Sequence, residues 1–245
     1  MLALITGGSR GIGASTAKLL AGQGWDVCLS YRVDGQAASE VADACRAAGR
    51  DAAVFPADVS SESDVVDLFR FCDGLGPLGA LVNNAGIVAP KARVADMGAR
   101  RIERIMAVNV LGPFMCAREA VRRMSTRHGG TGGVIVNVSS AASRLGSPGE
   151  YVDYAASKGA VDTMTIGLAR EVAAEGIRVN AVRPGITETE IHARNGQPDR
   201  LERLRANVPM QRPGTAEEVA EAIAWLCSES ASYVTGAVLD VAGGG

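Results

Sequence analysis

Short runs of apolar residues alternate along this chain with longer segments whose apolar positions recur at helical spacing. The short runs lack the alternation of apolar and polar residues that a half-exposed strand has, so they are predicted to be strands buried on both faces. The predicted strands cover residues 2–6, 26–31, 52–57, a run ending at 81–83, 134–138, 178–182 and 237–241.

The longer segments predict the helices between these strands. Residues 12–23, 35–48, 62–72, 151–174 and 216–227 fit single helices, and a long basic region over 96–127 is expected to bend at Gly112-Pro113. Strand and helix alternate about six times before a terminal strand. This predicts an α/β fold, a single doubly wound parallel sheet of the Rossmann type with helices on both faces. No linker or repeat is visible, so residues 1–245 are predicted to form one domain.

Composition excludes several classes of protein. The 245 residues are 47% apolar, enough to fill a large core, and carry a net charge of −2. A nucleic-acid-binding protein or a polybasic membrane binder would have a basic excess, so neither is expected. No run approaches the roughly 18 apolar residues of a membrane span, and the first residues do not resemble a signal peptide. The sequence therefore predicts a cytoplasmic protein.

The five cysteines are widely spaced and form no CxxC pair, so a zinc or thioredoxin-like site is not indicated and no metal is expected. They are predicted to be buried, reduced thiols. Glycine is in excess, with 30 residues, or about 12%, against a usual 7%. That excess suits loops whose backbone comes close to a ligand.

One such loop follows the first predicted strand. Residues 6–13 read TGGSRGIG and open directly into a helix. Glycines there let the backbone approach a pyrophosphate, which the N–H groups of the helix N-terminus bind. The spacing TGxxxGxG differs from the common GxGxxG, and a tight structural turn is the alternative interpretation.

Polar residues also follow the fourth and fifth strands. After the fourth comes NNAG at 83–86, which is either a turn or support for the cofactor region. After the fifth come Ser139 and Ser140, and fourteen residues beyond Ser140 stand Tyr154 and Lys158, one helical turn apart. A cation at that spacing would lower the phenol pKa from about 10 and make Tyr154 a useful acid or base.

Taken together, these motifs resemble those of the short-chain dehydrogenase/reductase family, especially bacterial reductases of the 3-oxoacyl-carrier-protein reductase and glucose-dehydrogenase types. The resemblance covers nearly the whole chain. It implies a catalytic set of Asn109, Ser140, Tyr154 and Lys158, in which Ser140 is chosen over Ser139 because the second serine of the pair matches the family pattern.

The resemblance also implies a cofactor site. Asp58 is expected to contact adenine, residues 184–189 to cover the nicotinamide, and a lid around 186–207 to close over the substrate. The expected cofactor-binding residues are Gly7, Ser9, Arg10, Gly11, Ile12, Gly13, Arg32, Asp58, Val59, Asn84, Ala85, Gly86, Tyr154, Lys158, Pro184, Gly185, Thr187 and Thr189.

The implied reaction is hydride transfer between a nicotinamide cofactor and a small-molecule carbonyl or alcohol. Tyr154 would give or take the proton, Ser140 would stabilise charge on the substrate oxygen, and Lys158 would hold the nicotinamide ribose. Asn109 would place a water that relays protons to Lys158. A homo-oligomer, expected to be a tetramer, is implied too, with small residues at Ala155, Ala156, Gly159 and Ala160 available for close packing.

The choice of dinucleotide rests on charge at the end of the second strand. Arg10 and Arg32 can both reach a 2′-phosphate, which favours NADP(H). NAD(H) stays possible, because Asp34 lies about 20 residues after the last glycine, where a ribose ligand is expected. Asp34 also suits the N-cap of the next helix.

Two further patterns bear on partners. Eight arginines lie between Arg93 and Arg127; they are interpreted as a solvated helix face with ion pairs such as Glu119–Arg123, with a docking patch for an acidic carrier as the alternative. The loops expected around the substrate hold a polar mixture that suits a polar substrate, namely Lys91, Arg93, Arg144, Glu150, Glu188, Glu190 and His192.

The favoured function is therefore an NADP(H)-dependent oxidoreductase. One alternative is an NAD(H)-dependent sugar or alcohol dehydrogenase. Another is a sensor that binds NADP(H) without turnover, which the intact acid/base set disfavours. An epimerase or dehydratase of the longer relatives would need a larger C-terminal region than 245 residues allow.

Overall fold

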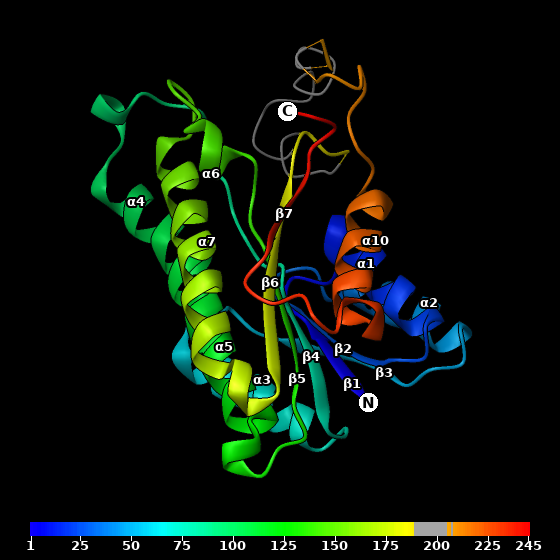
Figure 1. Cartoon of the computed structure of the whole chain (residues 1–245). Coiled ribbons are helices and arrows are strands. Elements are labelled where there is room, and N and C mark those ends of the chain that lie inside the picture. Colours follow the sequence, from blue (N-terminus) through cyan, green and yellow to red (C-terminus); the bar gives the residue numbers. More distant parts are fainter. Residues whose placement is uncertain (189–204, 207) are drawn as a thin grey trace.

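The computed structural model describes residues 1–188, 205–206 and 208–245 (Figure 1). In this part of the chain seven strands form one parallel sheet in the order β3-β2-β1-β4-β5-β6-β7. The strands are β1 (Leu2–Ile5), β2 (Asp26–Tyr31), β3 (Ala52–Pro56), β4 (Leu78–Asn83), β5 (Gly133–Val138), β6 (Ile177–Pro184) and β7 (Val238–Val241).

Helices cover both faces of this sheet, as predicted (Figure 1). One face carries α1 (Gly11–Gly22), α2 (Gly35–Ala47) and α10 (Ala216–Cys227). The other side carries α3 (Glu62–Asp73), α4 (Ala99–Met106), α5 (Gly112–Met124) and α7 (Val152–Val172). Short helical turns are η1 (Val94–Asp96), η3 (Thr126–His128), η4 (Ala173–Glu175), η5 (Glu229–Ala231) and α6 (Ala142–Leu145).

Burial on both faces explains why the strands are uniformly apolar. Successive strand side chains point to opposite faces. In β1, Leu4 joins the core beneath α3, α5 and α7, whereas Ile5 joins the core beneath α1, α2 and α10. Each is fully buried, and burying such a side chain contributes about 1.5–3 kcal/mol.

The strand order reverses between β1 and β4. From this point the chain fills the sheet outward through β2 and β3 on one side and through β5, β6 and β7 on the other. Loops diverge where the order reverses, which leaves a crevice at the carboxyl ends of the strands. The TGGSRGIG loop follows β1 and the NNAG loop follows β4, so the two lie on either side of that crevice.

The predicted helix over residues 96–127 is interrupted over more residues than expected. Helix α4 ends at Met106, a π-helical segment η2 (Ala107–Leu111) follows, and α5 begins at Gly112 with a proline in its first turn. Pro113 has no N–H to donate and its ring excludes the normal helical turn before it. The wider π turn accommodates this break.

Two other expectations concern the cysteines and membrane-spanning helices. All five cysteines are free and buried, as predicted. No helix in the described ranges is long and apolar enough to cross a membrane.

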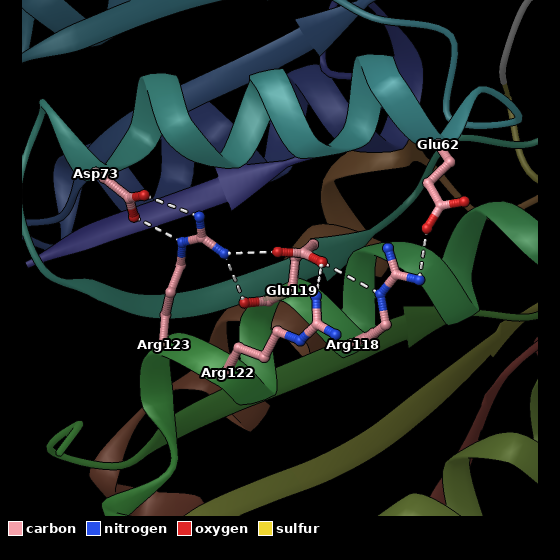
Figure 2. A network of polar contacts seen from close by, with 6 residues as sticks. All are labelled: Glu62, Asp73, Arg118, Glu119, Arg122 and Arg123. Atoms are coloured by element: carbon pink, nitrogen blue, oxygen red, sulfur yellow. Dashed lines mark hydrogen bonds and ion pairs between the residues drawn. The ribbon is translucent and has the colours of Figure 1, made fainter. Parts of the chain in front are cut away.

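A network of ion pairs joins α5 to α3 (Figure 2). Glu119 accepts hydrogen bonds from Arg122 at 2.7 Å and Arg123 at 2.9 Å, and Arg123 continues to Asp73 at 2.6 Å. The predicted Glu119–Arg123 pair is confirmed. The members of the network are Glu62, Asp73, Arg118, Glu119, Arg122 and Arg123.

The same pattern extends along the basic region. Of the eight arginines from Arg93 to Arg127, six are ion-paired within the described residues, namely Arg101, Arg104, Arg118, Arg122, Arg123 and Arg127. Most of this positive charge is therefore neutralised inside the chain. That favours the interpretation as paired helix faces over an open docking patch for an acidic carrier.

We expect Glu119→Gln to lower the free energy of unfolding by about 1–3 kcal/mol at pH 7, because three arginines lose a buried partner. Burial opposes ionisation of Glu119, but hydrogen bonds from Arg123 and Arg118 and the charge of Arg122 bring its pKa below the usual value. The carboxylate thus stabilises the fold above its ordinary pKa of about 4.5, and this stability is lost as pH falls through the lower folded value.

Urea unfolding at pH 7 and at stepwise lower pH measures this effect. The stabilities of wild type and variant should converge in acid. Glu62→Gln is the matched control, because Glu62 is exposed and should change stability by under about 0.5 kcal/mol. Equal stability of Glu119→Gln and wild type at pH 7 would contradict the role of the network.

Candidate functional site

A cavity of about 800 Å³ lies at the carboxyl ends of the strands, across the point where the strand order reverses. Most of the predicted site residues line it. These are Gly7, Ser9, Arg10, Gly11, Ile12, Arg32, Asp58, Val59, Asn84, Ala85, Gly86, Ser140, Tyr154, Lys158, Pro184, Gly185 and Thr187. Gly13 and Asn109 are not among the lining residues, and Thr189 and most of the predicted lid over 186–207 lie outside the described residues.

The loops after β1 and β4 are tied together across the crevice. Thr6 Oγ1 accepts hydrogen bonds from the backbone N–H groups of Asn84 and Ala85, both at 3.1 Å. Asn84 Nδ2 in turn donates to the carbonyls of Thr6 and Gly7, both at 2.9 Å. Gly7 has φ +64°, a left-handed conformation that favours glycine. The NNAG motif therefore supports the glycine loop rather than forming an isolated turn.

Gly13 has a packing role in this arrangement. A Cβ at this position would lie 2.5 Å from Asn84 Nδ2 and 2.6 Å from the Gly7 carbonyl oxygen. Any side chain would therefore push the two loops apart. Its contribution to the cavity is indirect, since it lets α1 start close to the β4 loop.

The N-terminus of α1 fits the pyrophosphate of a dinucleotide. Arg10 is the N-cap residue, and its side chain makes no capping hydrogen bond to the helix. Gly11 and Ile12, the first helical residues, line the cavity. A helix N-terminus without a side-chain cap presents N–H groups and a partial positive charge, which suit an anion.

The end of β2 carries positive charge towards the cavity. Arg32 is exposed and lines the cavity together with Arg10. Asp34 does not line it: one carboxylate oxygen accepts from the Ala37 N–H as the N-cap of α2, and the other pairs with Arg10 at 2.7 Å. The predicted N-cap role of Asp34 is confirmed.

Ser140 and Tyr154 interact at the end of β5. Ser140 Oγ also accepts from the Ala142 N–H at 3.2 Å, where α6 begins. The neighbouring Ser139 is used differently, because its Oγ is buried and donates to the Lys158 carbonyl at 3.2 Å. Of the two serines considered from the sequence, Ser140 is therefore the one whose hydroxyl acts on Tyr154 and lowers the pKa of the phenol.

Tyr154 and Lys158 lie one turn apart on α7. Lys158 Nζ is 5.7 Å from the centre of the Tyr154 ring and donates to the Val138 carbonyl at 2.7 Å. Burial lowers the pKa of Lys158 to about 8, against the opposing charge of Asp162. Burial also raises the pKa of Tyr154, and the hydrogen bond with Ser140 only partly opposes this.

The expected lowering of the Tyr154 pKa by Lys158 is therefore corrected. Removing a phenolate from water disfavours it more strongly than the nearby hydrogen bond favours it. The physical consequence is a phenol that keeps its proton at neutral pH. Such a group is suited to act as an acid.

Asn109 lies in the π-helical segment η2 and is fully buried. Its Oδ1 accepts from the Ile87 N–H at 2.9 Å, and its Nδ2 donates to the Ile87 carbonyl at 2.9 Å and to Ser157 Oγ at 3.1 Å. The side chain therefore fastens the loop after β4 to α7. Its predicted placing of a water remains a prediction.

An ion pair holds the start of α7. Arg101 on α4 binds both carboxylate oxygens of Asp153, at 2.7 and 3.2 Å, and also donates to the Pro90 carbonyl. Asp153 Oδ1 accepts from the Tyr154 N–H at 2.9 Å. Burial opposes ionisation of Asp153, but the hydrogen bonds from Arg101 and Tyr154 lower its pKa. The pair thus connects α4 and the loop after β4 to the helix that carries Tyr154.

We expect Asp153→Ala to reduce the free energy of unfolding by about 3 kcal/mol, because it leaves the largely buried Arg101 guanidinium without its partner. Chemical denaturation at pH 7 measures the change. Asp96→Ala, which removes an exposed carboxylate from the same loop region, should stay within about 0.5 kcal/mol of wild type. A similar change for both variants would contradict the role assigned to this pair.

The substrate side of the cavity differs from the polar mixture expected. Lys91, Arg93, Arg144 and Glu188 do not line it, Glu150 does, and Glu190 and His192 lie outside the described residues. The described wall is mainly apolar, with Val88, Ala142, Leu145, Pro148, Tyr151, Ile186, Val208 and Ala242. Helix α6 is four residues long, too short for periodicity to reveal, and it supplies Ala142 and Leu145 to this wall.

Comparisons with known proteins agree with this geometry. A family model described as enoyl-(acyl carrier protein) reductase matches residues 7–245. The chain is 58% identical to the uncharacterized oxidoreductase YgfF of Escherichia coli K12 over 244 residues, 99% of each protein. It is 40% identical to the cis-4-hydroxycyclohexanecarboxylate dehydrogenase of Sinomonas cyclohexanicum, covering 99% of this chain and 95% of that one.

A solved structure is also similar to this chain over nearly its whole length. The crystal structure of a short chain dehydrogenase from Burkholderia cenocepacia J2315 in complex with NADP superposes with a TM-score of 0.90 at 33% identity. It covers 99% of this chain and 96% of that one. The chain belongs to the short-chain dehydrogenase/reductase family. As a member of this family it is an oxidoreductase that uses a nicotinamide cofactor.

Proposed function

We propose that this short-chain dehydrogenase/reductase interconverts apolar ketones and secondary alcohols with NADP(H), using Tyr154 as acid and base. The observation that carries the proposal is the meeting of Ser140, Tyr154 and Lys158 in one cavity with the uncapped N-terminus of α1. A sensor without turnover would need the helix N-terminus but not a half-buried phenol next to a serine hydroxyl that lowers its pKa.

The chain's own residues divide the work along the cavity. The N-terminus of α1 would bind the pyrophosphate, Pro184, Gly185 and Thr187 would lie over the nicotinamide, and Lys158 would bind the ribose next to it. When bound, the nicotinamide supplies or accepts the hydride. Because the loops after β1 and β4 are held by hydrogen bonds, this half of the site needs little rearrangement to bind.

At the reacting oxygen, Tyr154 gives a proton in reduction and takes it back in oxidation. Its raised pKa keeps that proton in place at neutral pH, which favours reduction. Ser140 Oγ donates to the substrate oxygen and stabilises the charge that develops there. Lys158 returns the proton to Tyr154, and a water near the η2 segment of Asn109 would connect Lys158 to solvent.

Arginine at the end of β2 supports NADP(H) over NAD(H). Arg32 and Arg10 line the cavity there, and a guanidinium fork suits a 2′-phosphate. Asp34 is the carboxylate that could instead bind a free ribose, but it does not line the cavity. It caps α2 and pairs with Arg10. The NADP in the Burkholderia structure is consistent with this preference.

The apolar wall supports the substrate class. Leu145, Pro148 and Tyr151 line the same cavity as Tyr154 and offer few partners for the hydroxyls of a sugar. A relative at 40% identity is named for cis-4-hydroxycyclohexanecarboxylate, a compact ring that carries a secondary alcohol and a carboxylate. We therefore place the substrate among alicyclic or branched ketones and their alcohols.

A panel of carbonyls and alcohols followed at 340 nm with NADPH and NADH tests the proposal. Cyclic and branched ketones should be reduced with NADPH at least about tenfold more efficiently than aldoses or acyl thioesters. Tight NADPH binding without turnover of any panel member would favour a sensor. A preference for sugars with NADH would favour an NAD(H)-dependent sugar dehydrogenase.

We further propose that the protein is a homotetramer. Leu111, Phe114 and Ile166 are exposed apolar side chains on η2, α5 and α7, which lie on one side of the sheet. Of the small residues considered for contact, Ala156 is exposed but Ala155 is buried within its own chain.

Light scattering should give a molar mass of about 100 kDa, four times that of the 25.2 kDa chain, and Phe114→Glu should reduce this mass. A 25 kDa particle at micromolar concentration would contradict the assembly.

A further inference from the structure

A polar cluster after β3 has no part in the chemistry at Tyr154. Asp58 Oδ1 accepts two hydrogen bonds from Ser60, from its N–H at 3.0 Å and its hydroxyl at 2.6 Å. Asp58 Oδ2 accepts from Arg104 Nη2 at 2.8 Å, and Arg104 Nη1 also donates to Ser60 Oγ at 2.6 Å. Arg104 is on α4, 46 residues away in sequence, so the cluster joins two separate elements.

The cluster lies at the end of the cavity away from Tyr154. Asp58 and Val59 follow β3, the edge strand beside β2, whereas Ser140 follows β5 on the other side of the reversal. Val59, Val108 and Arg104 all line this end of the cavity. Two valines beside a carboxylate form a site with apolar sides and one anionic acceptor, which suits a flat heterocycle that carries an amine.

The charge of Asp58 is fixed by its partners. Burial opposes its ionisation, but the hydrogen bonds from Ser60 and Arg104 outweigh burial and lower its pKa. An ionised carboxylate only accepts hydrogen bonds. Oδ1 already has two donors and Oδ2 has one, so the remaining acceptor capacity is on Oδ2, the oxygen that Arg104 holds.

We propose that Arg104 is a positioning residue for the adenine of the dinucleotide. It holds Asp58 Oδ2 at the cavity wall as the acceptor for the 6-amino group, with Ser60 holding the other oxygen. This inference rests on the proposed dinucleotide function and adds a determinant of base identity to it. A base with a 6-oxo group would present an oxygen to the carboxylate, and two acceptors repel.

The experiment compares two cofactors that differ only at this atom. Dissociation constants for NADPH and for its 6-oxo analogue, the reduced hypoxanthine dinucleotide phosphate, are measured by nicotinamide fluorescence. The proteins are wild type, Arg104→Met, Asp58→Asn and the double variant. Wild type should prefer NADPH at least about tenfold, the size of one hydrogen bond to a charged group.

Arg104→Met should weaken NADPH binding about fivefold or more and change binding of the 6-oxo analogue less than twofold. In the Asp58→Asn background the same substitution should change NADPH binding less than twofold, because Arg104 acts through Asp58. Arg100→Met is the matched control, since Arg100 is exposed on the same helix and outside the lining, and it should change neither constant.

Several outcomes would overturn the inference. Equal loss for both cofactors would mean that Arg104 does not act on the base, and an undiminished effect in the Asp58→Asn background would mean a direct contact instead. If Arg104→Met does not fold, Ser60→Ala gives the same test and should reduce the preference for NADPH about threefold; an unchanged preference would refute the cluster's role. Wild-type protein that binds neither cofactor would refute the proposed function itself.

Discussion

Tyr154→Phe should lower kcat by about 10²- to 10⁴-fold while the dissociation constant for NADPH stays within twofold of wild type. The substitution removes only the phenolic oxygen, and the ring keeps its place on α7 beside Lys158. Turnover then lacks the proton donor that stands beside Ser140. Cofactor binding is spared because the glycine loop and the N-terminus of α1 are untouched.

Steady-state rates at 340 nm and fluorescence titration with NADPH measure the two quantities on the same protein. Tyr233→Phe is the matched control, since Tyr233 is fully exposed and outside the cavity lining, and it should be indistinguishable from wild type. A rate for Tyr154→Phe within threefold of wild type would show that another group supplies the proton.

Arg32→Asp combined with Arg10→Ala should shift the preference from NADPH towards NADH by at least about a hundredfold. The 2′-phosphate would lose two cationic partners and meet a carboxylate, while the ribose hydroxyls of NADH would gain an acceptor. A hydrogen bond to a charged group contributes about 1.5–3 kcal/mol, and each 1.4 kcal/mol is about tenfold in affinity. The hundredfold shift is less than two full hydrogen bonds of this kind would give, because Arg32 is exposed and solvent weakens its interaction with the phosphate.

The two arginines should not contribute equally. Arg10 already forms an ion pair with Asp34, so part of its charge is neutralised. Arg32→Asp alone should therefore give the larger part of the shift in cofactor preference. Asp34 should continue to cap α2 after Arg10→Ala, because that hydrogen bond goes to the Ala37 N–H. Dissociation constants for all four cofactor forms measure the effect, with Arg93→Asp, outside the lining, as the control. Wild type that binds NADH as tightly as NADPH would refute the assignment.

Apolar patterning was sufficient to predict the fold because the constraint is local. A strand covered on both faces needs apolar side chains at every position, and β1 divides its residues between two cores. The proposed cofactor side of the cavity was predictable for a related reason. Its residues immediately follow strands, and a parallel sheet brings the carboxyl ends of its strands to one edge.

Contacts across the fold were not predictable in the same way. Arg101 and Arg104 appeared as members of a solvated basic helix, yet their partners Asp153 and Asp58 lie 52 and 46 residues away. Nothing in the spacing indicates these pairs. Only the packing of α4 against α7 and the loop after β3 brings them together.

The direction of the pKa shift of Tyr154 could not be predicted from the sequence either. Helical spacing correctly placed Lys158 one turn from the phenol, but it carried no information about burial. Burial raises the pKa of Tyr154 and lowers that of Lys158, so the expected direction was wrong for the phenol. The apolar substrate wall was missed likewise, because several charged side chains of those loops do not line the cavity.

The most direct test of the central claim follows the hydride itself. NADPH carrying deuterium at both C4 positions is incubated with the enzyme and the ketone of the panel that turns over fastest, and the alcohol is analysed by mass spectrometry and NMR. Transfer of one deuterium to the carbinol carbon, in an amount equal to the NADPH consumed, is predicted for wild type, with at most about one hundredth of that rate for Tyr154→Phe. Consumption of NADPH without deuterium at that carbon, or no consumption with any ketone, would contradict the account.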